Sequence, residues 1–219
     1  PYLARRLQWP FPADDCHDGM PLSNGTFGAL VWGDAARLAF TINRADYWDH
    51  RGGTVFSHEG TYQNMRRWLE AGDAESIRRV FERPNVGAPG EPAMPTRLPM
   101  GRIELLFPSG ETVAAGLDML YGQAELEVGG SGGATEVRAV ITPAPRHVLA
   151  VRIAGPGAAE ARALPRPPES EQVVEYFRRY GCPQAAPFDE GDLAGWVQER
   201  PGEPALCVAV LTCRGAEAT

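Results

Sequence analysis

The sequence predicts a mainly β protein, a large antiparallel β-sandwich with a few short helices. Two observations lead to this prediction. The 25 glycines and 20 prolines form about a fifth of the 219 residues, which suits short strands joined by turns. The middle of the chain also carries short apolar segments separated by turn-forming residues, a spacing that is typical of a sandwich or barrel. We expect residues 1–219 to form one such domain.

The first predicted element is a β-hairpin. Residues 27–32 and 38–42 are apolar runs, and the Gly33-Asp34-Ala-Ala segment between them supplies a turn. The tripeptide Asn24-Gly25-Thr26 has the form of a glycosylation acceptor, but it leads straight into the first strand. We therefore interpret it as a turn.

Two short helices are predicted to follow the hairpin. Residues 61–69 have a helical rhythm with Gly72 as C-cap, and their apolar face consists of Tyr62, Met65, Trp68 and Leu69. Asp73 caps the second helix and Pro84 ends it, and its buried stripe is formed by Ile77, Val80 and Phe81. Residues 84–101 hold five prolines and read as an irregular loop.

The rest of the chain reads as mostly β. Its separators include the glycine-rich run 129–133, which joins two strands and is interpreted as a hairpin loop rather than a phosphate cradle. Residues 155–170 lack a clear pattern and predict a surface excursion, 171–180 an amphipathic helix, and 205–212 a final buried strand. The other candidate strands are 102–107, 112–119, 123–128, 136–142 and 147–153.

The charge and the composition argue against several classes of function. The net charge is −7 and every basic residue is arginine, which argues against a nucleic acid partner and excludes a P-loop or a Schiff-base lysine. The chain lacks the long uncharged apolar run of a membrane span, so we expect no membrane partner. The cysteines have no repeated spacing and are interpreted as small core residues, with their disulfide state open: Cys16, Cys182, Cys207 and Cys213.

Tests for catalytic groups give weak signals. His50 and His58 flank a glycine-rich loop near Asp46 and Asp49, but loop residues of this kind are usually solvated, so we expect no metal and no cofactor. No serine lies in a nucleophile elbow. Paired carboxylates could serve in hydrolysis of a glycosidic bond. The candidate pairs are Asp14-Asp15, Asp46 with Asp49, and Asp189-Glu190.

The densest polar and aromatic cluster lies after the first hairpin, at residues 43–51. Aromatic faces flanked by carboxylates and arginine suit a sugar ring, which stacks through its C–H face while its hydroxyls form hydrogen bonds. The alternative is that Tyr47 and Trp48 pack as local core. The candidate substrate-binding residues are Asn43, Asp46, Tyr47, Trp48, Asp49, His50 and Arg51.

A resemblance to a known family adds to this reading. The run from Met20 to Gly33, MPLSNGTFGALVWG, resembles the opening hairpin of glycoside hydrolase family 95, the α-L-fucosidase family. Trp9 matches a tryptophan that precedes this hairpin in the family. Residues 43–48 match a segment in which the family has an asparagine, an acidic residue and a tryptophan, and residues 98–107 match a later strand. The resemblance covers roughly residues 9–153, with departures such as Ser23 in place of a glycine.

The resemblance implies a bacterial glycosidase whose N-terminal super-sandwich precedes a catalytic (α/α)6 barrel. No position here matches the barrel's catalytic groups, so no catalytic residue is assigned. We expect residues 1–219 to be an inactive N-terminal domain cut at both ends, with the barrel and a carbohydrate as partners and residues 43–51 as a wall of the sugar pocket. A stand-alone carbohydrate-binding module, with Trp32 joining the aromatic platform, and a purely structural module are the alternatives. Localisation stays open, because a signal peptide preceding Pro1 would direct export.

Overall fold

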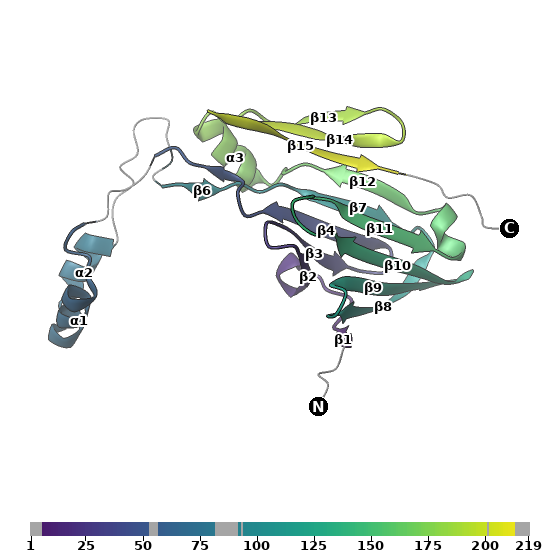
Figure 1. Cartoon of the computed structure of the whole chain (residues 1–219), viewed down its shortest axis with the longest axis horizontal. Coiled ribbons are helices and arrows are strands. Elements are labelled where there is room, and N and C mark those ends of the chain that lie inside the picture. The colour runs from purple at the N-terminus through teal and green to yellow at the C-terminus, as the bar shows by residue number, and fades with distance from the viewer. Residues whose placement is uncertain (1–5, 53–56, 82–91, 93, 201, 213–219) are drawn as a thin grey trace.

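Two five-stranded antiparallel sheets form the body of the protein (Figure 1). The computed structural model describes residues 6–52, 57–81, 92, 94–200 and 202–212. The first sheet has the order β1-β8-β9-β10-β11, formed by Arg6–Trp9, Gly110–Asp118, Gln123–Gly130, Gly133–Ile141 and Leu149–Ala154. The second has the order β12-β7-β4-β3-β2, formed by Arg162–Arg166, Arg102–Leu106, Arg37–Arg44, Phe27–Gly33 and Met20–Ser23. The predicted mainly β fold is confirmed.

The core lies between these two sheets, because alternate side chains of each strand point inward. In β3 the residues alternate between buried and half-buried over their whole length. The inward side chains of the two sheets belong to one apolar cluster, in which Val31, Leu38, Phe40, Ala124 and Val137 are completely buried. Burial of this kind is the main stabilising contribution to such a fold.

Turns at the edges follow the predicted chemistry. The hairpin between β3 and β4 contains Gly33 at φ 113°, where an added Cβ would collide with the carbonyl oxygen of Arg37. The 24–26 turn is held by Asn24, whose Oδ1 accepts hydrogen bonds from the backbone N–H groups of Thr26 (3.1 Å) and Phe27 (2.8 Å). The 129–133 segment joins β9 and β10 as expected.

A third sheet extends the sandwich. Strands β13 (Ala186–Asp189), β14 (Leu193–Arg200) and β15 (Glu203–Leu211) pair in that order, and helix α3 (Glu171–Arg179) leads into them (Figure 1). Trp196 of β14 is completely buried, and an added Cβ at Gly101 would lie 3.0 Å from its ring. Phe177 of α3 is also completely buried and belongs to the common core. The third sheet is therefore packed on the second.

The helix pair α1 (Tyr62–Ala71) and α2 (Ala74–Phe81) projects away from the sheets (Figure 1). The predicted C-cap is confirmed, because Gly72 closes α1 in the left-handed conformation at φ 67°. Thr61 is the N-cap, and its side chain accepts a hydrogen bond from the backbone N–H of Asn64. None of the helices in the described part of the chain is long and apolar enough to cross a membrane.

The predicted burial of this helix pair is only partly correct. Trp68 and Val80 are buried, whereas the exposed fraction is 73% for Tyr62, 63% for Leu69 and 45% for Phe81. Two isolated helices can bury only the side chains that face each other, and the sheets lie too far away to cover the rest. The pair therefore presents an exposed apolar surface.

Other predictions need correction. The segment 155–170 is not a surface excursion: it contains the 3-10 helix η2 (Pro156–Ala159) and the edge strand β12, whose Pro165 suits an edge. The final strand β15 forms as predicted but is not buried, and Leu211 is 66% exposed, because it lies at the edge of the third sheet. Strands β1, β2, β5, β6, β13 and β14 were not predicted.

The cysteines also differ from the predicted core role. Cys182 is buried as expected, but Cys16 of the 3-10 helix η1 (Cys16–Asp18) is half-buried and Cys207 of β15 is exposed. All three carry free thiols. Pro84, expected to end α2, and Cys213 lie outside the described residues.

Candidate functional site

The predicted site, residues 43–51, begins at the end of β4 and contacts the third sheet through Arg200. It contains the short strand β5 (Trp48–Asp49), which pairs antiparallel with β6 (Thr96–Arg97). Because successive side chains of a strand point to opposite sides, Tyr47 and Asp49 are buried, while Trp48 is half-buried and His50 is exposed. The segment therefore has an inner and an outer face.

The inner face is centred on the ion pair between Asp49 and Arg51. The carboxylate of Asp49, 2% exposed, accepts hydrogen bonds from Nε (3.0 Å) and Nη2 (2.9 Å) of Arg51 and from its backbone N–H (3.1 Å). Burial alone would raise the pKa of Asp49, but the hydrogen bonds from Arg51 outweigh it, so the pKa lies below the ordinary value. Asp49 is therefore ionised at neutral pH.

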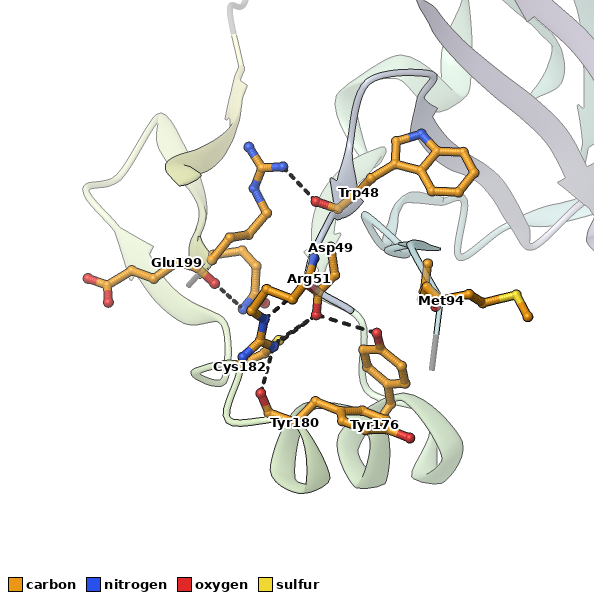
Figure 2. Close-up of polar contacts among 11 residues, drawn as sticks. Trp48, Asp49, Arg51, Met94, Tyr176, Tyr180, Cys182 and Glu199 are labelled. Atoms are coloured by element: carbon orange, nitrogen blue, oxygen red, sulfur yellow. Dashed lines mark hydrogen bonds and ion pairs between the residues drawn. The ribbon is translucent and has the colours of Figure 1, made fainter. Parts of the chain in front are cut away.

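Helix α3 and the turn after it complete this inner cluster (Figure 2). Nη2 of Arg51 donates to the carbonyl oxygen of Tyr180 at 2.6 Å, and the hydroxyl of Tyr176 donates to Asp49 at 3.4 Å. The thiol of Cys182 lies 3.9 Å from the Asp49 carboxylate, and burial raises the pKa of that thiol. These contacts join residues that are 127 to 133 positions apart in the sequence.

Arg200 of β14 fixes the segment from a second side. Its Nη1 donates to the carbonyl oxygen of Trp48 at 3.1 Å, and its guanidinium carbon lies 4.7 Å from the centre of the Tyr47 ring. The Tyr47 side chain is 2% exposed, and burial raises the pKa of its hydroxyl. A ring enclosed in this way is packed as local core and has no free face for a sugar.

The outer face carries an aromatic pair and an exposed ion pair. The rings of Trp48 and His50 are stacked with centres 6.4 Å apart and an interplanar angle of 23°. The indole N–H of Trp48 donates to the carbonyl oxygen of Ala45 at 2.7 Å, and its ring points away from the Asp49–Arg51 cluster (Figure 2). Arg44 holds Asp46 through two hydrogen bonds of 2.8 and 2.6 Å, which lower the pKa of Asp46.

Asn43 begins the segment within β4, where it is opposite Gly28 in β3. Its side-chain Oδ1 is buried and has no hydrogen-bond partner among the residues that the structure describes. A buried oxygen of this kind has unused capacity to accept a hydrogen bond, which costs free energy unless a donor arrives. Among the described candidate residues the Tyr47 hydroxyl shares this property, because it is also buried and has no hydrogen-bond partner.

Sequence reasoning selected the 43–51 segment as a candidate site but did not identify the residues that contact it. The predicted residues divide into an inner set and an outer set. The inner set consists of the buried Tyr47 and Asp49 and the half-buried Arg51, and the outer set consists of Asp46, Trp48 and His50. The residues that hold the inner set were not predicted: Tyr176, Tyr180, Cys182 and Arg200. The only sequence signal for them is the i,i+4 spacing of the two tyrosines on an expected helix, which gives no indication of their partner.

The carboxylates of this segment suit ion pairing more than proton donation. A general acid needs a raised pKa, whereas the pKa values of Asp46 and Asp49 are both lowered by their arginines. In the described part of this loop, the histidines and carboxylates do not form a group of three possible metal ligands. Among the described residues, Asp15, Cys16 and His17 do offer three ligand atoms within 4.8 Å of one another, on an exposed turn.

Surface hollows lie elsewhere. Two of them, of about 400 and 190 Å³, are lined by residues of the 107–110, 128–135 and 156–162 segments and by none from 43–51.

Comparison with known proteins agrees with this picture. A family model described as glycosyl hydrolase family 65, N-terminal domain, matches residues 7–177, which is most of the chain. None of the curated proteins matches the chain. The matched range contains both main sheets, the 43–51 segment and most of α3, and it ends before the third sheet. The expected glycosidase N-terminal domain is thus supported, with family 65 named where the motif resemblance indicated family 95.

Proposed function

The chain belongs to the family of glycosyl hydrolase family 65 N-terminal domains, and we propose that residues 1–219 form the non-catalytic sandwich domain of a larger bacterial glycosidase. In this proposal the catalytic groups lie in a C-terminal (α/α)6 barrel outside the 219 residues. That barrel cleaves a glycosidic bond with inversion, using a general acid and an activated water. The lowered pKa values of Asp46 and Asp49 support a non-catalytic role for this domain, because neither carboxyl group is suited to act as a general acid.

We further propose that the whole enzyme is related to the family 95 α-L-fucosidases. The support is the hairpin motif from Met20 to Gly33, which the structure places in β2, β3 and the turn between them. This hairpin precedes the 43–51 segment directly through β4, so the motif and the candidate site belong to one continuous structural unit.

The role proposed for residues 43–51 is to form one wall of the barrel's sugar pocket. The observation that carries it is the outer face, where the rings of Trp48 and His50 are stacked and the backbone of Trp48 is held by Arg200 from the other side. A fixed aromatic surface beside the Arg44–Asp46 pair offers stacking for a sugar ring and hydrogen bonds for its hydroxyls. Tyr47, Asp49 and Arg51 support this wall from within.

The wall is tested by titrating neutral oligosaccharides, including fucosylated ones, while tryptophan fluorescence is recorded. Saturable quenching that disappears in Trp48→Ala is the expected result. Tyr62→Ala is the matched control, because it removes an exposed aromatic ring from α1, away from the sandwich. Quenching that survives Trp48→Ala but is lost in the control would overturn the assignment.

The domain organisation is tested by intact-protein mass spectrometry of the natural gene product. A mass several times 23.7 kDa, with turnover of aryl glycosides that the 219-residue chain lacks, is expected. Turnover by the 219-residue chain itself, lost on changing Asp46 or Asp49, would contradict a non-catalytic role.

A purely structural module is the second candidate, and the exposed surface of α1 and α2 favours it. Tyr62, Leu69 and Phe81 form an apolar surface that a structural domain would bury against its neighbour. We expect the isolated chain to self-associate through it. Sedimentation of a Tyr62→Glu/Leu69→Glu variant measures this: the variant is monomeric where the parent chain associates, and equal behaviour of both would remove the support.

A further inference from the structure

Three arginines converge on one buried carboxylate on the outer face of the second sheet. Glu104 of β7 has a side chain that is only 4% exposed. Its Oε1 accepts from Nε of Arg102 at 2.8 Å and from Nη1 of Arg37 at 3.4 Å, and its Oε2 accepts from Nε of Arg166 at 3.0 Å. The strand registers explain the convergence, because Arg166 is opposite Arg102 across β12 and β7, and Arg37 lies on the neighbouring strand β4.

This cluster holds more positive charge than Glu104 needs. Burial alone would raise the pKa of Glu104, but the hydrogen bonds from Arg102 and Arg166 lower it, so its carboxylate is charged at neutral pH. A single arginine can satisfy a carboxylate through two parallel hydrogen bonds. Three arginines around one Glu104 therefore leave an excess of two positive charges, of which Glu169, 3.6 Å from Arg102 and half-exposed, offsets one.

Each arginine also has unused donors. Every one of the three gives a single hydrogen bond to Glu104, and the described part of the chain offers their remaining N–H groups no other hydrogen bond. The side chains of Arg37, Arg102 and Arg166 are 42%, 31% and 42% exposed. These guanidinium groups are held in place by Glu104 and are partly exposed to water, so they are arranged to bind a further planar anion.

An aromatic ring adjoins the cluster. The guanidinium carbon of Arg37 lies 5.4 Å from the ring centre of Trp32 in β3, and the Trp32 indole N–H donates to the hydroxyl of Thr41 at 2.8 Å. Trp32 is half-buried, so its ring offers fixed apolar surface beside the positive charge. A ligand that combines an apolar ring face with a carboxylate would match both features.

We propose that the cluster of Arg37, Arg102, Arg166 and Trp32 binds a carboxylate-bearing sugar, a uronic acid unit of an oligosaccharide. The preference for a carboxylate rests on the arginines, whereas the choice of a sugar as its carrier rests on the proposed function. The site is separate from the Trp48 wall, although both lie along β4 and its continuation.

The direct test records the arginine Nε–Hε signals of the isotope-labelled 219-residue chain by NMR. The probe is trigalacturonate at constant ionic strength, and its methyl ester, which has the same sugars without the charge, is the control ligand. The signals of Arg37, Arg102 and Arg166 should shift saturably with trigalacturonate and stay in place with the ester. Unchanged signals, or an equal response to the ester, would overturn the proposal.

A matched internal control distinguishes binding from general attraction of anions. Arg138 of β10 donates to Glu136 at 2.7 Å on the outer face of the other sheet, and its side chain is 44% exposed. Its signal should not move with trigalacturonate. A shift of Arg138 as large as that of Arg102 would mean unspecific association and would refute the site.

Variants complete the test. Arg37→Gln removes the longest of the three contacts, so the fold should tolerate it, and the loss of one charge-assisted contact should weaken trigalacturonate binding roughly tenfold. Arg138→Gln should bind like the parent chain, and equal affinity of both variants would contradict the proposal. Trp48→Ala should leave the arginine shifts intact, so that failure at Trp48 and failure at this cluster are separate results.

Discussion

At the level of single residues, two arginine–carboxylate pairs of the 43–51 segment differ in how much water surrounds the carboxylate. The Asp49 side chain is 2% exposed, whereas that of Asp46 is 55% exposed. A buried carboxylate that loses its partner keeps an uncompensated charge, while an exposed one is solvated instead. The two pairs therefore have different roles despite similar distances.

This difference predicts the effects of two matched substitutions. Arg51→Met should lower the free energy of unfolding by about 3 kcal/mol, because Asp49 stays buried without its ion pair. Arg44→Met should lower it by less than about 1 kcal/mol, because Asp46 remains in water. Urea denaturation measures both, and equal losses in the two variants would contradict the proposed support role of Asp49.

The same buried carboxylates predict an acid-sensitive fold. The pKa values of Asp49 and Glu104 are lowered from ordinary values of 3.8 and 4.5, so the folded state binds fewer protons than the unfolded state at those pH values. Their contribution is complete above the unfolded pKa and is lost as the pH falls through the folded pKa.

Denaturant titrations at successive pH values check this expectation. The free energy of unfolding should fall on acidification below about pH 4.5, where the carboxylates of Glu104 and Asp49 begin to take up protons. In Arg51→Met the fall should be shallower, since Asp49 no longer has its stabilising partner. A flat profile between about pH 5 and about pH 3 would be inconsistent with the ion pairs described.

Single residues also show what sequence could predict about the site. The composition of residues 43–51 was the basis for proposing this segment as the candidate site. It could not separate Tyr47 from Trp48, because burial is set by partners that are far away in the chain. Arg200 reaches Trp48 across 152 positions, and no local pattern encodes that contact.

At the level of elements, the β3–β4 hairpin depends on its glycine. Gly33 and Gly25 both have a positive φ, of 113° and 93°, but only Gly33 has backbone atoms within 4 Å of an added Cβ. Gly25→Ala should therefore cost about 1–2 kcal/mol from backbone strain alone. Gly33→Ala should cost clearly more, because the hairpin must also move away from Arg37.

Thermal unfolding followed by circular dichroism compares the two glycine variants. A larger fall in Tm for Gly33→Ala is expected. If both variants lost the same amount, the collision at Arg37 would be relieved without cost, and the tight turn would not be a determinant of the hairpin.

The elements that were predicted from sequence share strong local signals. The hairpin strands have apolar runs with turn residues between them, and α1 has a cap at each end. The missed strand β12 contains Pro165 and Arg166, which forms an ion pair with Glu104, so its pattern reflects an edge position rather than burial. Strands β5 and β6 have two residues each, too few for any periodicity.

At the level of the whole molecule, the third sheet is part of the structure that holds the candidate site. The family match ends at residue 177, yet Cys182, Trp196 and Arg200 lie beyond it and contact the core or the 43–51 segment. A domain boundary drawn at the end of the match would remove these contacts. The sandwich and the third sheet are therefore best treated as one unit.

Truncation tests whether the sandwich and the third sheet form one structural unit. A chain ending at residue 180 should unfold at lower temperature than the 219-residue chain and show faster backbone hydrogen exchange at Trp48 and Asp49. Arg200→Gln, which removes one contact only, should give a smaller increase in exchange at Trp48 with near-parent stability. Unchanged exchange in the truncated chain would mean that the third sheet does not hold the segment.

The buried thiol of Cys182 provides a way to measure how often this part of the structure opens. A thiol reagent can modify Cys182 only when the region around Asp49 and α3 opens, whereas Cys207 is exposed on β15 in the same molecule. The ratio of the two modification rates therefore reports how often the region around Asp49 and α3 opens, without added labels. A ligand that closed a partner domain over residues 43–51 would slow the first rate and leave the second unchanged, so the chain carries its own reporter of domain closure.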